Sequence, residues 1–355
     1  MDISEITINV LKVFSLGTAG FLLAFFLTPA LTHFLYKYKL WRKTARTNAM
    51  DGKPAPVFHK LHEQREVGVP RLGGLLVWLT TVFVTFLFAG LSKISDNFWL
   101  QKLDFLSRDQ TWLPLGTLVA GALLGLSDDI LQIFGKGKYA GGGIRFTRRL
   151  LAVLMIGIVG AWWFYFKLGW HTIHIPGNGN IEIGFWYLPL FVITILACWS
   201  GGIIDGIDGL SGGTFGIMFG AFSVIAFAKT QYNLAAFCAV LAGTTLAFLW
   251  FNIPPARFYM GESGMLGLTV TLATVAFLTD SIVVLPIIGG LLVIETGSVI
   301  LQLISKKFFH KKLFLCAPIH HHLEAKGWLP EKITMRFWIL GMVFAIIGVT
   351  IRLLG

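Results

Sequence analysis

Apolar segments of about 20 residues recur along this chain, and they constrain its fold more than any other feature. An α-helix needs about that length to cross the roughly 30 Å hydrocarbon core of a bilayer. Of the 355 residues, 55% are hydrophobic and 13% are charged, and the mean hydropathy is +0.73. Soluble domains carry about 25% charged residues. The sequence therefore predicts an all-α polytopic membrane protein, with residues 1–355 forming a single integral membrane domain.

Polar breaks divide the chain into ten predicted transmembrane helices. Their expected positions are near residues 9–36, 72–91, 112–127, 147–167, 186–201, 214–229, 233–251, 264–279, 282–305 and 334–354. The connection 168–185 alternates in polarity like a small β-hairpin. The three cysteines have no spacing typical of a disulfide framework or a zinc site.

The basic residues predict the orientation of these helices. Twenty-two of the 29 Lys and Arg residues lie in the connections 37–71, 128–149, 252–263 and 306–336. Basic connections resist translocation and stay on the cytoplasmic side. We therefore expect both termini on the extracytoplasmic side and five cytoplasmic segments, the fifth being 202–213. This topology explains the formal charge of +11. We expect no nucleic-acid partner, because no basic module with interleaved aromatic residues lies outside the membrane segments.

Carboxylates gather in the predicted cytoplasmic segments. Asp128 and Asp129 are adjacent at the inner end of the third helix, where their mutual repulsion is costly unless a cation neutralises them. Such oxygen ligands suit magnesium, which usually takes one or two carboxylates plus substrate phosphates. Taken alone, the pair is explained equally well by a solvated helix end. Asp205 and Asp208 follow in a segment with six glycines, which predicts close backbone access to a phosphate ligand or, alternatively, a plain helix break.

The last two inner segments add further candidates. Glu262 is a possible third carboxylate for the metal, and Tyr259 suggests either stacking on a base or an ordinary interfacial aromatic residue. His320, His321 and His322 are consecutive, so on a helix they point about 100° apart and cannot share a zinc ion. Contact with phosphate is the more favoured interpretation. Basic residues of the segment 136–149 are expected mainly to enforce topology, with a few holding substrate phosphates.

Together these motifs resemble the phospho-N-acetylmuramoyl-pentapeptide transferase family, within the polyprenyl-phosphate N-acetylhexosamine-1-phosphate transferase superfamily. The resemblance covers nearly the whole chain, and its motifs occur in family order. They are PRLGG at 70–74, DD at 128–129, DGIDG at 205–209, FNIPPARFYMGESG at 251–264 and APIHHHLEAKGW at 317–328.

The resemblance implies an activity and a location. The activity is transfer of phospho-MurNAc-pentapeptide from UDP-MurNAc-pentapeptide to undecaprenyl phosphate, which gives lipid I and UMP in peptidoglycan synthesis. The expected location is the bacterial inner membrane, among membrane lipids and with the active site facing the cytoplasm. A homodimer is common in the family and is a possible state here.

The resemblance also implies roles for individual residues. Asp129 and Glu262 are the expected magnesium ligands, Asp128 a base or orienter for the lipid phosphate, and His321 a partner of the diphosphate. The residues expected to bind substrate are Lys136 at the diphosphate, Asp205 and Gly206 at the uridine, Tyr259 at the uracil, and Asp208, Asn252, His320 and His322. Direct in-line attack by the lipid phosphate is the default route, and a two-step route through a phospho-aspartate stays open.

Several positions depart from the family pattern. Glu262 stands where aspartate is usual, Trp199 and Gly202 where asparagines are usual, Met265 for a serine, and Glu66 and Gln132 for lysines. PRLGG resembles the branch that transfers GlcNAc phosphate, because the muramoyl branch usually reads PTMGG. Two alternatives therefore stay open: a transferase that uses UDP-GlcNAc or another UDP-N-acetylhexosamine, and a non-catalytic relative that binds the lipid carrier.

Overall fold

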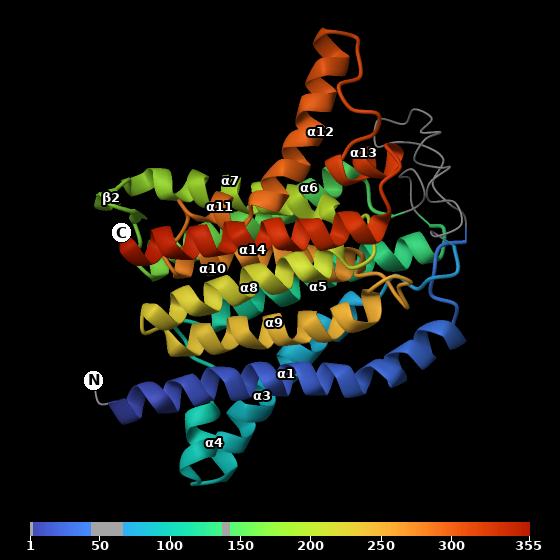
Figure 1. Cartoon of the computed structure of the whole chain (residues 1–355). Coiled ribbons are helices and arrows are strands. Elements are labelled where there is room, and N and C mark those ends of the chain that lie inside the picture. Colours follow the sequence, from blue (N-terminus) through green and yellow to red (C-terminus); the bar gives the residue numbers. More distant parts are fainter. Residues whose placement is uncertain (1–2, 44–66, 137–142) are drawn as a thin grey trace.

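The structure is a bundle of long helices that run roughly parallel to one another (Figure 1). It is a computed structural model, and it describes residues 3–43, 67–136 and 143–355. In those residues, nine helices are long and apolar enough to cross a membrane. The chain begins and ends at the same end of the bundle (Figure 1). The prediction of an all-α polytopic membrane protein is confirmed.

The long helices correspond closely to the apolar segments of the sequence. They are α1 (Ile3–Lys37), α3 (Gly74–Ile94), α5 (Trp112–Ile133), α6 (Phe146–Trp162), α7 (Tyr187–Ser200), α8 (Leu210–Ala228), α9 (Tyr232–Asn252), α10 (Gly261–Leu278), α12 (Gly290–Phe308) and α14 (Pro330–Leu354). The short helices are α4 (Phe98–Leu103), α11 (Leu285–Ile288) and α13 (Ile319–Ala325). The predicted hairpin is confirmed, since β1 (Thr172–Ile175) pairs antiparallel with β2 (Gly179–Glu182).

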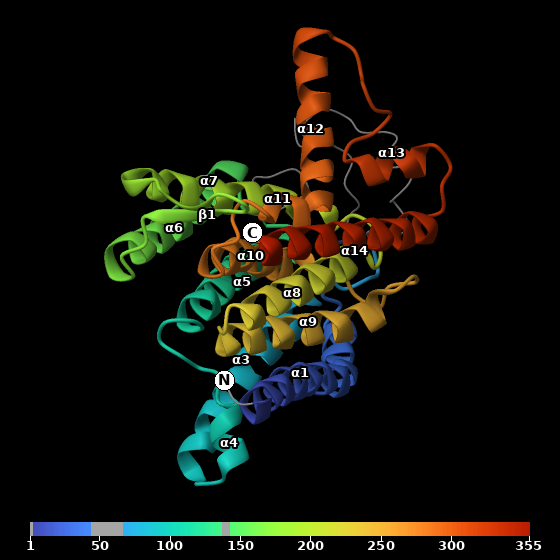
Figure 2. The same ribbon diagram turned by 60° about the vertical axis from the view of Figure 1, so that its left-hand side comes forward.

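The predicted helix 282–305 is not one continuous helix. α11 ends at Ile288, and α12 begins at Gly290 and projects away from the bundle (Figures 1 and 2). Two adjacent glycines, Gly289 and Gly290, account for the break, because glycine destabilises a helix interior by about 1 kcal/mol relative to alanine. The face of α12 that turns inward is polar, with Glu295, Ser298 and Gln302 all buried. Its opposite face exposes large apolar side chains, as a lipid-facing helix does.

α10 is the central helix, and glycines let its neighbours approach it closely. A Cβ atom on Gly125 of α5 would overlap the carbonyl of Glu262, and one on Gly74 of α3 would overlap Gly264. Small residues at such positions allow helix backbones to touch inside a membrane. As a result, the last turns of α5 lie against the first turn of α10, which positions the acidic residues described next.

Candidate active site

Two aspartates cap the first turn of α10. The side chain of Asp129 accepts hydrogen bonds from the backbone N–H groups of Glu262 (3.1 Å) and Ser263 (2.8 Å), and Asp205 accepts one from Gly261 (3.3 Å). The first N–H groups of a helix have no partner within the helix and carry partial positive charge, so carboxylates are stabilised there. The backbone of Gly261 has φ +70°, which favours glycine. The backbone N–H groups of three consecutive residues therefore bring Asp129, from α5, together with Asp205, from the segment before α8.

Asp128 and Glu262 converge on one guanidinium group. The Nη1 atom of Arg149 lies 3.3 Å from Oδ2 of Asp128 and 2.9 Å from Oε1 of Glu262. Asp128 is buried and also accepts hydrogen bonds from the backbone of Ile144 and the side chain of Gln132, both at 2.5 Å. Sequence reasoning grouped Arg149 with the topology-setting charges and missed this bridging position.

Two further arginines supply positive charge around the acidic residues. The side chain of Gln132, which stands where the family usually has lysine, accepts a hydrogen bond from Arg42. Arg71, from the PRLGG motif, lies close enough to attract the carboxylates of Asp129 and Asp205. Burial raises the pKa of the Asp205 carboxyl, while a hydrogen bond from Ser211 and the charge of Arg71 oppose that rise. The acidic site thus carries its own counter-charges.

Asp208 and Asn252 hold two loops together. Asp208 accepts a hydrogen bond from the backbone of Ala256 (3.1 Å). The Asn252 side chain accepts one from the backbone of Gly209 (2.9 Å) and donates one to the carbonyl of Phe258 (2.8 Å). These contacts fix the turn after Asp205 against the loop before α10. Both side chains were predicted to bind substrate, a role that stays a prediction, and the structure gives them a clear positioning role.

His320 and His321 point at the same glycine. The Nδ1 atom of His320 lies 2.9 Å from Glu295 of α12, and that of His321 lies 2.7 Å from Glu324. A carboxylate at Nδ1 fixes the orientation of an imidazole ring and leaves Nε2 for other partners. A Cβ atom on Gly206 would overlap Nε2 of His320 and lie close to Nε2 of His321. Sequence reasoning did not single out either glutamate for this orienting role.

Three further residues predicted to bind substrate are His322, Lys136 and Tyr259. The Nδ1 atom of His322 accepts a hydrogen bond from the backbone of Leu315 (3.1 Å), so His322 does not join the other two histidines. Lys136 is exposed just beyond the end of α5, and the ring of Tyr259 is half-buried. The backbone of Tyr259 pairs with Pro70 and Gly73, both at 2.8 Å, and ties the PRLGG motif to the loop before α10.

Known proteins match this chain over almost its whole length. Residues 111–280 match the family model described as glycosyl transferase family 4. A phospho-N-acetylmuramoyl-pentapeptide-transferase from Geobacillus sp. (strain WCH70) is 35% identical over 339 residues, which cover 94% of this chain and 95% of that protein. The chain belongs to the phospho-N-acetylmuramoyl-pentapeptide-transferase family. Further relatives of that name come from Lactiplantibacillus plantarum (35% identity over 93% of this chain and 95% of the relative) and Bacillus subtilis (33% over 94% and 95%).

Two departures from the pattern of this transferase family are neighbours in space. A Cβ atom on Gly202 would lie 3.9 Å from Cε of Met265, and Met265 is buried. Methionine fills irregular gaps readily because its side chain is unbranched and flexible. Met265 therefore contributes apolar packing beside the position where Gly202 has no side chain. Glu66, another departure, lies outside the described residues.

The acidic residues supply carboxylate oxygens of the kind that magnesium takes, but they do not form a closed metal cage. Across residues 3–43, 67–136 and 143–355, no three His, Cys, Asp or Glu side chains lie close enough together to hold a metal ion. Magnesium seldom needs such a cage, because it usually takes one or two carboxylates and completes its shell with water and phosphate. Asp129 lies next to Glu262, from whose backbone N–H it accepts a hydrogen bond at 3.1 Å, and the Glu262 carboxylate already faces the cationic guanidinium group of Arg149.

Proposed function

We propose that this family member is a magnesium-dependent enzyme that transfers phospho-MurNAc-pentapeptide from UDP-MurNAc-pentapeptide to undecaprenyl phosphate and releases UMP. One observation carries the proposal: Asp128, Asp129, Asp205 and Glu262 gather with arginines at one end of a membrane bundle that is 35% identical to such a transferase over 94% of its length. The basic segments next to this end favour a site that faces the cytoplasm.

The mechanism assigns the acidic residues to two tasks. Asp129 and Glu262 would hold magnesium, which when bound neutralises the diphosphate and stabilises the charge on departing UMP. Asp128, fixed by Ile144 and Gln132, orients or deprotonates the lipid phosphate. An oxygen of that phosphate attacks the phosphorus that carries the sugar, and the P–O bond to UMP breaks. Phosphoryl transfer of this kind depends on positioning and charge neutralisation more than on a protein nucleophile.

The histidines and the loop residues bind the donor in this scheme. When protonated, His320 and His321 donate from Nε2 to the diphosphate beside Gly206, with Glu295 and Glu324 holding the rings. Exposed Lys136 adds a flexible positive charge for the same group. The ring of Tyr259 is accessible for stacking on uracil.

A donor comparison tests this function. Purified protein in detergent with magnesium and undecaprenyl phosphate is expected to release UMP from UDP-MurNAc-pentapeptide at least about tenfold faster than from UDP-GlcNAc, a difference of ~1.4 kcal/mol. The comparison is necessary because the PRLGG motif, which contains Arg71, resembles the branch that transfers GlcNAc phosphate. Release from UDP-GlcNAc alone would assign the other donor. Folded protein that releases UMP from neither donor would contradict an enzymatic role.

Arg149→Gln is expected to strengthen magnesium binding. The guanidinium group of Arg149 competes with magnesium for Glu262, one of the two proposed ligands. Its removal also leaves the carboxylates of Glu262 and Asp128 to repel each other until a cation binds. Magnesium should raise the Tm of the variant to half of its full effect at about one tenth of the concentration that wild-type protein needs. This difference corresponds to ~1.4 kcal/mol of binding free energy. Thermal unfolding across a magnesium titration measures this directly.

Arg148→Gln is the matched control, because Arg148 is the adjacent residue and is exposed. It should follow the wild-type titration. Equal magnesium responses in wild-type protein and both variants would remove Glu262 from the metal site. A Tm rise with calcium but none with magnesium would reject magnesium as the ion.

A further inference from the structure

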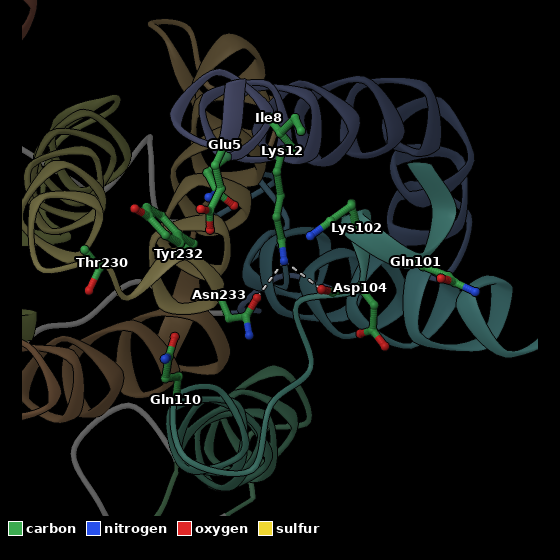
Figure 3. A pocket seen from close by; sticks show the side chains of 11 residues that line it. Glu5, Ile8, Lys12, Gln101, Lys102, Asp104, Gln110, Thr230, Tyr232 and Asn233 are labelled. Atoms are coloured by element: carbon green, nitrogen blue, oxygen red, sulfur yellow. Dashed lines mark hydrogen bonds between the residues drawn. The ribbon is translucent and has the colours of Figure 1, made fainter. Parts of the chain in front are cut away.

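A polar cavity lies at the end of the bundle opposite the acidic site. Its volume is about 360 Å³, and its walls come from the first turns of α1, the end of α4 and the start of α9. Lys12 projects from α1 into the middle of this cavity, with Glu5 and Lys102 on either side of it (Figure 3). None of these residues has a part in the proposed reaction.

Lys12 is a buried cation inside a membrane span. Its side chain is 8% exposed, and it lies in the span Glu5–Lys37. Its Nζ atom donates to the carbonyl of Asp104 (2.7 Å) and to Oδ1 of Asn233 (2.6 Å), both of which are neutral oxygens (Figure 3). An ammonium group has three N–H donors. Buried charges in membrane spans are costly and commonly mark a functional site.

A second cavity of about 230 Å³ adjoins the first and is largely apolar. Both cavities are lined by Ile8, Lys12 and Lys102, and the second adds apolar side chains. These are Leu11, Trp99 and Leu103. Lys102 is close enough to Lys12 for their positive charges to repel each other. A polar cavity and an apolar cavity therefore meet at two lysines.

The surroundings place this junction at the edge of a membrane. On α1, Leu11 is 47% exposed and Phe14 72%, as expected for side chains that face lipid. On α4, Phe98 and Trp99 are also exposed, and α4 extends sideways from the bundle in both views (Figures 1 and 2). Tryptophan is enriched at the level of lipid headgroups.

We propose that these two cavities bind one zwitterionic aminophospholipid, of the phosphatidylethanolamine type, from the leaflet opposite the acidic site. Its phosphate contacts Lys12 and Lys102 at the junction, where the headgroup of a phospholipid joins its acyl chains. Its ammonium group lies in the polar cavity near Glu5, and one acyl chain follows Leu11, Trp99 and Leu103.

Charge complementarity selects this occupant. The two lysines that border both cavities favour an anion at the junction, since Asp104 lines only the polar cavity. Glu5 borders only the polar cavity, which requires a cation farther from the apolar side. The carboxylate of Asp104 attracts Lys12 through space, but it accepts its hydrogen bonds from Ser92 and the backbone of Leu106, each at 3.0 Å. A primary ammonium group can donate hydrogen bonds to a carboxylate, whereas a quaternary one cannot.

Native mass spectrometry of the full chain tests the site. Protein in detergent is mixed with equal amounts of phosphatidylethanolamine, phosphatidylglycerol and phosphatidylcholine of the same acyl chains. Wild-type protein is expected to retain one phosphatidylethanolamine about tenfold more often than either other lipid. Lys102→Gln should lower retention of phosphatidylethanolamine and phosphatidylglycerol alike, and Glu5→Gln should abolish only the preference between them.

Lys93→Gln is the control, since Lys93 is an exposed lysine near the end of α3 and lines neither cavity. Quenching of tryptophan fluorescence by phosphatidylethanolamine with brominated chains should fall in Trp99→Phe, which locates the acyl chain. Equal retention of the three lipids by wild-type protein would overturn the proposal. The proposal would also be overturned if Glu5→Gln and Lys102→Gln retained lipids as the control does. The same holds if glycerophosphoethanolamine, which lacks acyl chains, were retained as well as phosphatidylethanolamine.

Discussion

Asp129→Asn is expected to lower UMP release about 10³-fold, the loss typical of removing a group that stabilises transition-state charge. The carboxylate of Asp129 is fully buried and holds two backbone N–H groups at the start of α10. Asparagine has the same shape but only one oxygen, so its amide group would face one of these donors instead of accepting from it. The variant also loses a negative charge that the proposed magnesium ion requires.

Rates with UDP-MurNAc-pentapeptide at saturating magnesium measure the loss, and Tm shows whether the variant is folded. Asp96→Asn is the control, since Asp96 is an exposed aspartate outside the site. The proposed role predicts that the variant stays folded and that raising magnesium does not restore its rate. If the Asp129→Asn variant kept more than about a tenth of the wild-type rate, Asp129 would act only as a helix cap.

The sequence predicted the long helices because apolar length is a strong signal in a membrane protein. It missed the break between α11 and α12, although Gly289 and Gly290 stand together there. Isolated glycines are frequent in membrane helices, so this pair carried little weight as a signal on its own. The polar inward face of α12 was the second signal, since Glu295 has no place on a helix surrounded by lipid.

The sequence also singled out the acidic residues that the structure brings together, because charges near apolar segments are rare. The sequence did not reveal which residues contact these carboxylates. Arg149 and Arg71 lie in segments with several basic residues, and only the fold distinguishes a guanidinium group beside a carboxylate from one that faces solvent. The pairing of His320 with Glu295 joins residues 25 positions apart, which no local pattern reveals.

Gly125→Ala is expected to displace the first turn of α10 and to inactivate the protein. A Cβ atom at Gly125 would overlap the carbonyl of Glu262, which is backbone and cannot rotate away as a side chain does. Forcing extra atoms into such a contact costs about 1–3 kcal/mol. Because α10 carries Glu262 and the N–H groups that hold Asp129, a shift of about 1 Å is expected to lower the rate about 100-fold.

Gly116→Ala separates this effect from a general effect of alanine in α5. Gly116 lies in the same helix, and a Cβ atom there would meet no atom within 4 Å. Since alanine favours a helix over glycine by about 1 kcal/mol, Gly116→Ala should keep or raise Tm and keep the wild-type rate. Gly125→Ala with the same Tm and rate as Gly116→Ala would mean that α5 and α10 can separate without harm. Reduced rate with unchanged Tm would instead show that the close contact serves the acidic site more than the stability of the bundle.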